Sequence, residues 1–153
     1  MRKEFFLFIY LLIFALLEST ILNYFRVFGA KPDLLLVSIV VFGLYLSNFW
    51  IITLSCFAGL LLDIFCFYSF GINTILFCSI GIICKKISRN LYIENNSVII
   101  SLVFLASIIA GIVRGSLISG MPFVAIFKLC LPQAFYTAIF CPFVFRVLSI
   151  FPY

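Results

Sequence analysis

The sequence contains no histidine and few charged residues. Charged side chains make up 10% of the 153 residues and hydrophobic ones 66%, whereas an ordinary soluble domain is about 25% charged. This leaves too little polar surface to cover a water-soluble globule, so lipid must solvate much of the chain. A Ser–His–Asp set is impossible without histidine, and no glycine-rich phosphate-binding loop occurs. We therefore expect no enzyme activity and no cofactor.

The cysteines and the net charge exclude two further classes of function. All six cysteines fall inside apolar runs, and none forms a CxxC pair. A zinc site without histidine would need clustered thiolates, so we expect no metal. The net charge of +5 does not indicate a nucleic-acid partner, because the basic residues are scattered. Their one dense group, Lys85, Lys86 and Arg89, is typical of a cytoplasmic membrane loop.

The apolar runs predict membrane-spanning helices, each of which needs about 20 residues. The first run reaches about Phe25, which is long for a signal-peptide core, and no cleavage site follows. The run Leu34–Leu62 is too long for one span and short for two, and the placement of the basic residues, described next, favours two helices with a tight hairpin near Ser47 and Asn48. The sequence thus predicts one all-α transmembrane domain over residues 1–153, with six helices at about 5–24, 33–47, 50–67, 71–87, 97–118 and 124–147.

The basic residues orient these helices. With a hairpin at residues 47–49, the basic loop that begins at Lys85 lies on the same side as Arg2 and Lys3, which the excess of Lys and Arg in cytoplasmic loops favours. The outer loops then carry only Arg26 and Lys31. We expect a multi-pass protein with both termini in the cytoplasm.

Three ionisable residues lie well inside the predicted spans: Glu18, Asp63 and Arg114. Each lies in the outer half of an outward-running helix, at comparable depth. Charges are costly there, so three interpretations remain: separate snorkelling to the outer headgroups, an ion pair between Arg114 and one or both carboxylates, or a site for a partner or ligand. Asp33 and Asn73 are expected to cap the second and fourth helices.

Small residues recur every four positions on the fifth predicted helix. Ser107, Gly111, Gly115 and Ser119 form a stripe that lets another helix approach closely. Gly59 on the third helix is a further candidate for close helix packing. The stripe serves either packing within the molecule or docking of another protein's transmembrane helix.

Three short motifs, which follow one another along the chain, resemble those of the MreD family of bacterial rod shape-determining membrane proteins. Residues 32–36 read Pro-Asp-Leu-Leu-Leu, which is similar to the family's PDLLL segment. Residues 59–63 read Gly-Leu-Leu-Leu-Asp and residues 71–73 read Gly-Ile-Asn, similar to its GLLxD and GxN segments. Residues 17–20 read Leu-Glu-Ser-Thr, where the family commonly has Leu-Gln-Ser, so Glu18 departs from the pattern.

The resemblance implies a non-catalytic scaffold subunit of the cell-elongation complex, or elongasome, which carries out peptidoglycan synthesis. Its implied partners are an MreC-like membrane protein and, in the same complex, MreB, RodA and a class B penicillin-binding protein. It also implies a place in the bacterial inner membrane and a six-helix fold like that of the substrate-binding subunits of energy-coupling-factor transporters. The alternative function is a small-ligand-binding membrane subunit of a vitamin-type transporter.

Overall fold

A computed structural model of the chain describes residues 2–20, 24, 31–65, 71–90, 96–118 and 122–148. The elements among them are six α-helices: α1 (Arg2–Thr20), α2 (Leu34–Tyr45), α3 (Asn48–Phe65), α4 (Ile72–Asn90), α5 (Asn96–Ile118) and α6 (Phe123–Leu148).

The helix bounds confirm the all-α prediction and the six predicted helices. The tight hairpin is confirmed as well, because α2 ends at Tyr45 and α3 begins at Asn48. Leu46 takes an extended conformation that stops α2, and the carbonyl of Ser47 accepts a hydrogen bond from the N–H of Ile51 in the first turn of α3. Only two residues separate the helices, so the chain reverses direction at once.

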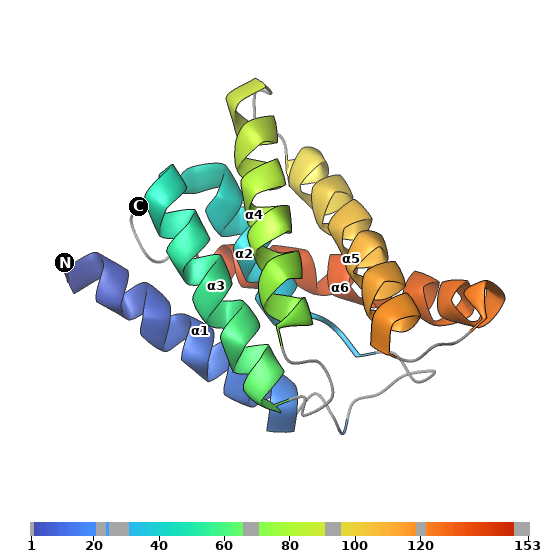
Figure 1. Cartoon of the computed structure of the whole chain (residues 1–153). Helices are drawn as coiled ribbons and strands as arrows, with labels where there is room; N and C mark the ends of the chain where they lie inside the picture. Colours follow the sequence, from blue (N-terminus) through green and yellow to red (C-terminus); the bar gives the residue numbers. More distant parts are fainter. Residues whose placement is uncertain are drawn as a thin grey trace.

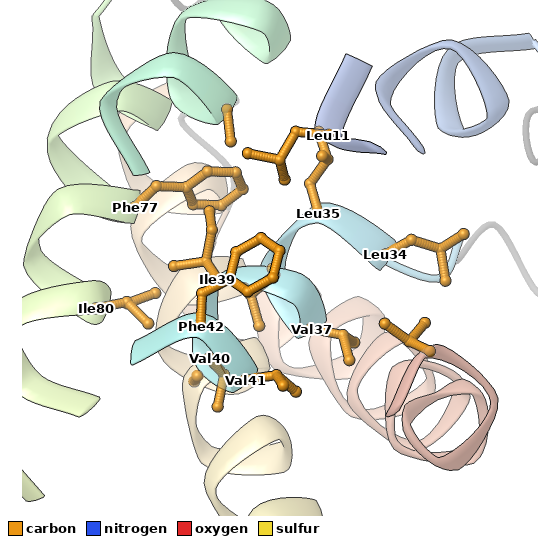
Figure 2. Packing of buried hydrophobic residues seen from close by; sticks show 14 of the residues in the cluster. Leu11, Leu34, Leu35, Val37, Ile39, Val40, Val41, Phe42, Phe77 and Ile80 are labelled. Carbon is orange, nitrogen blue, oxygen red and sulfur yellow. The ribbon is translucent and has the colours of Figure 1, made fainter. Parts of the chain in front are cut away.

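Helix α2 lies at the centre of the molecule and contacts α1, α3, α4, α5 and α6. Every residue from 34 to 44 is buried. Figure 2 shows Leu35 beside Leu11 of α1, and Ile39 beside Phe77 of α4. An all-round apolar helix is therefore covered on every side by protein.

The other helices form two groups around α2. On one side α3 packs along α4 and α1 packs against α3; on the other α5 packs along α6 (Figure 1). The C-terminal ends of α1, α3 and α5 gather at the same end of the bundle as the N-terminal ends of α2 and α4 (Figure 1). We call this the network end, because the polar contacts described below are there.

Length and hydropathy qualify three of the described helices to cross a membrane, through segments Asn48–Phe65, Ser97–Leu117 and Val124–Val147. The apolar stretches Phe6–Thr20 and Leu34–Tyr45 are shorter. Twelve residues of α2 rise only about 18 Å, against a hydrocarbon core of about 30 Å. These helices indicate a membrane protein, while six crossings and the likeness to energy-coupling-factor subunits stay predictions.

Candidate functional site

Asp63 joins the end of α3 to the start of α4. Its side chain is 2% exposed, and its two oxygens accept hydrogen bonds from the backbone N–H of Gly71 at 3.0 Å, Asn73 at 3.3 Å and Thr74 at 3.2 Å. The Thr74 hydroxyl at 2.6 Å and the Asn73 amide at 3.0 Å donate to it as well. A carboxylate at a helix N-terminus satisfies free N–H groups and opposes the positive end of the helix dipole. Asp63 is therefore the cap of α4, supplied from the preceding helix.

Arg114 of α5 connects this cap to α2. Its Nη1 lies 2.5 Å from Oδ2 of Asp33, and its Nε donates to Oδ1 of Asn73 at 2.8 Å. The guanidinium also lies over the ring of Phe77, 5.4 Å from the centroid. Since Asn73 donates to Asp63, one connected set of hydrogen bonds runs from α3 through α4 and α5 to Asp33 at the start of α2.

Asp33 has a second task at the start of α2. Its Oδ1 accepts from the backbone N–H of Leu36 at 3.1 Å, so it is the N-cap. Its own N–H donates to the hydroxyl of Thr137 on α6 at 3.3 Å, and that hydroxyl donates to the carbonyl of Gln133 at 2.7 Å. One aspartate, 1% exposed, thus links α2, α5 and α6.

Glu18 connects α1 to the same end of α2. Its Oε2 accepts from the backbone N–H of Leu35 at 3.2 Å, and its Oε1 lies 3.7 Å from Nζ of Lys31. Glu18 is 1% exposed, while the side chain of Lys31 is 31% exposed. Together Glu18, Asp33 and Asp63 hold the network end of the bundle.

The partner of Arg114 differs from the one predicted. One of the three interpretations pairs Arg114 with Asp63 or Glu18 and gives Asp33 only a capping role, whereas the ion pair that the structure shows joins Arg114 to Asp33. Asp63 is reached through Asn73, which lies inside α4 as its second residue and is not its cap. Asp33 lies at the start of α2, and Arg114 lies near the end of α5. Both ends are at the same side of the predicted membrane, and this shared depth was the one signal in the sequence that the two side chains could meet. A role of Glu18, Asp63 and Arg114 in binding a partner stays a prediction.

The small residue Gly59 sets the spacing of α3 and α4. A Cβ built there would collide with the backbone of Thr74. The lack of a side chain lets α3 approach the first turn of α4 closely enough for Asp63, one turn further on, to reach the N–H groups. The motif residues Gly59, Asp63 and Asn73 therefore act together in one helix junction.

The small-residue stripe of α5 faces α6. A Cβ on Gly111 would lie 2.5 Å from Sγ of Cys130, and one on Gly115 would lie 2.8 Å from Cγ2 of Ile126. Ser107 is buried at 2% exposure on the same helix, while Ser119 lies outside the described residues. At its two glycines the stripe therefore serves packing within the molecule.

An apolar groove of about 390 Å³ opens between α4 and α5. We call it the α4–α5 groove. These two helices touch little, and the lining between them is hydrocarbon except at Ser79 and Cys84. Its walls are Ile72, Ile75, Leu76, Ser79, Ile80, Ile83, Cys84 and Ile87 of α4, with Leu102, Leu105, Ala106, Ile109, Val113 and Leu117 of α5.

The carboxylates of Glu18, Asp33 and Asp63 already accept backbone N–H donors. Within the described ranges, no three Cys, Asp or Glu side chains gather as metal ligands.

Comparison with known proteins identifies the family. Residues 1–151 of the 153 match the family model described as "rod shape-determining protein MreD". Neither the curated proteins nor the solved structures gave a match. Because the match covers nearly the whole chain, this protein belongs to the MreD family, whose role is in determining rod shape.

Proposed function

We propose that this protein is a non-catalytic scaffold subunit of the cell-elongation complex, and that it binds the transmembrane helix of an MreC-like partner in the α4–α5 groove. Family membership supports the cellular process. The size, position and chemistry of the groove support a helix as the occupant.

The dimensions of the α4–α5 groove carry the proposal. Its lining runs from Ile72 to Ile87 along α4, which is about 22 Å at 1.5 Å per residue. Apolar side chains remain open along it, with Ile75 71% exposed and Leu105 56% exposed. The hydroxyl of Ser79 donates to the carbonyl of Ile75, so it presents no free donor. A groove of this length and polarity suits a transmembrane helix, which packs by close van der Waals contact.

The polar network fixes the distance between the two walls of the groove at one end. Arg114 follows Val113 of one wall, and Asn73 follows Ile72 of the other. The hydrogen bond between Arg114 and Asn73 therefore joins the two walls at the network end. In this proposal the predicted site residues act on the partner indirectly: Asp63 and Arg114 position α4 and α5, and Glu18 holds α1 to the start of α2.

The proposed setting is the bacterial inner membrane, with residues 1–153 as one transmembrane domain. We propose six crossings with both termini in the cytoplasm, which the basic residues near Lys85 support. MreB, RodA and a class B penicillin-binding protein are proposed members of the same complex. The network end would then face outward.

The alternative, a ligand-binding subunit of a vitamin-type transporter, requires a polar pocket. The hydrocarbon lining of the α4–α5 groove favours a helix over a polar vitamin.

Photo-crosslinking in living cells tests the proposal. Benzoylphenylalanine at Ile83 or Ile109, 55% and 53% exposed in the groove, should yield an adduct with the MreC-like protein. The matched control is Ile139, which is 69% exposed on α6 outside the groove and should yield none. Adducts from the control position alone would place the partner elsewhere. Co-purification of an ATPase module instead of the MreC-like protein would favour the transporter alternative.

A further inference from the structure

A second groove lies at the opposite end of the bundle from the network, on another face of α4. It has a volume of about 330 Å³ and is lined from α4 by Ile82, Lys85, Lys86 and Arg89. Lys85 and Lys86 lie three and four residues after Ile82, and Arg89 lies four and three residues after them, so the four positions share one face of the helix. Lys86 and Arg89 are exposed and Lys85 is half-buried. Among the residues that the structure describes, the lining holds three cations and no acidic side chain. We call it the basic groove.

The first turns of α3 form the other wall. Asn48, Ile51 and Ile52 line it, again from one helix face. Ile51 is buried, while Ile52 is 46% exposed and faces the groove with Ile82, which is 50% exposed. The basic groove therefore combines an apolar wall with a positively charged rim. Such a lining matches a ligand that has both a hydrocarbon part and a negative charge.

Close packing beneath the basic groove makes it a preformed site. A Cβ on Gly81 of α4 would lie 2.6 Å from Oγ of Ser55, so α3 and α4 are in direct contact there. The hydroxyl of Ser88 donates to the carbonyl of Leu44 at 2.8 Å, which ties the last turns of α4 to the end of α2. The three basic residues project from a helix that is held on two sides.

Aromatic residues indicate the depth of the basic groove. Trp50, the single tryptophan of the chain, packs edge-on against Phe49 with ring centroids 5.6 Å apart, beside the groove residue Ile51. Phe49 is 71% exposed. Tryptophan concentrates at the membrane–water interface, at the level of the lipid headgroups. A ligand can therefore enter the basic groove from the bilayer itself.

We propose that the basic groove binds an anionic phospholipid, with its phosphate between Lys85, Lys86 and Arg89 and an acyl chain along Ile52 and Ile82. Basic pockets between transmembrane helices on the cytoplasmic side hold anionic headgroups by charge attraction. The binding site uses a different face of α4 from the α4–α5 groove. It rests on the protein lying in a membrane and is independent of partner docking.

Exchanging two adjacent aromatic residues, Phe49→Trp with Trp50→Phe, moves the single tryptophan to the side of α3 that borders Asn48 and Ile52, where it reports on this site. The full-length protein is reconstituted in vesicles of equal parts phosphatidylcholine and phosphatidylglycerol, with bromine, a quencher of tryptophan fluorescence, on the acyl chains of one lipid or the other. Bromine in both leaflets makes the result independent of orientation. We expect a preference for phosphatidylglycerol of about fivefold or more, because one basic residue near a membrane surface contributes about 1 kcal/mol.

Substitution of the basic residues separates the site from the bulk membrane. The triple variant Lys85→Gln, Lys86→Gln, Arg89→Gln should lower the preference to about one, because it removes all three charges that attract the anionic lipid. Lys128→Gln, an exposed lysine on α6, should leave the preference unchanged. Circular dichroism checks that the variants fold. A preference that persists in the triple variant, or is absent from the protein that keeps the three basic residues, overturns the proposal.

Two further measurements distinguish lipid binding from binding of a protein segment and from partner docking. If the protein that keeps its three basic residues shows no lipid preference, while a glutamate-rich peptide alters the tryptophan fluorescence only when those residues are present, the groove takes an acidic protein segment and the lipid proposal is wrong. The crosslink from Ile109 to the MreC-like partner should survive in the triple variant. If the triple variant loses the lipid preference and keeps the crosslink, lipid binding in the basic groove is independent of partner docking in the α4–α5 groove.

Discussion

The ion pair between Arg114 and Asp33 can be separated from the helix cap that Asp33 also provides. Asp33→Asn removes the charge but keeps an oxygen for the N–H of Leu36, because asparagine caps helices about as well as aspartate. Arg114→Met removes the guanidinium and keeps a long apolar side chain. The two changes together leave no charge of the pair behind.

The expected magnitudes follow from the hydrogen bonds that each change removes. Asp33→Asn loses one buried charge-assisted bond, worth about 2 kcal/mol. Arg114→Met loses that bond and the one to Asn73, for about 3 kcal/mol in all. The double variant loses the same two bonds, so it should also fall by about 3 kcal/mol, where simple addition would require about 5 kcal/mol. The coupling free energy is therefore about 2 kcal/mol.

Reversible unfolding in mixed micelles of dodecyl maltoside and sodium dodecyl sulfate, followed by circular dichroism, measures these free energies. A second cycle pairs Arg114→Met with Asp63→Asn and should give a coupling below about 1 kcal/mol, since Asn73 lies between the two side chains. If the effects of Arg114→Met and Asp33→Asn add to within about 0.5 kcal/mol, the ion pair does not stabilise the fold and the reasoning is refuted.

Four further predictions concern the cap, two glycines and the topology. Asp63→Leu should destabilise the protein by at least about 3 kcal/mol in the same unfolding assay, because it leaves several N–H donors of α4 without their acceptor. Gly59→Ala should destabilise by about 1–3 kcal/mol through overpacking against Thr74, and a full wild-type stability would show that α3 can move aside freely. Gly111→Leu should lower the yield of folded protein, since its side chain would meet Cys130 of α6; an unchanged yield contradicts this packing. A cysteine placed at position 90 in a cysteine-free background should resist a membrane-impermeant reagent added to intact cells, and labelling there would refute the cytoplasmic orientation.

The helices could be predicted from the sequence because their signals are local. Apolar runs gave most of the helices, and the placement of the basic residues was needed to separate α2 from α3, which it did to within about two residues. The cap at Asp33 was predictable for the same reason, since an N-cap bonds to the N–H of a residue only three positions away. The family motifs at residues 32–36 and 59–63 were visible in the order of the letters alone.

What the sequence by itself determined was therefore the helical class, the six helices and the family. Only the tertiary structure decided that Arg114 meets Asp33, that the glycines of α5 face α6, and that α4 and α5 diverge to leave a groove. The physical reason is that an apolar side chain satisfies lipid and protein neighbours equally well. Periodicity consequently cannot distinguish the buried faces of α2 from the open faces of α4 and α5. An ion pair between two helices likewise depends on which helix ends lie side by side. Only the folded structure places the start of α2 beside the end of α5.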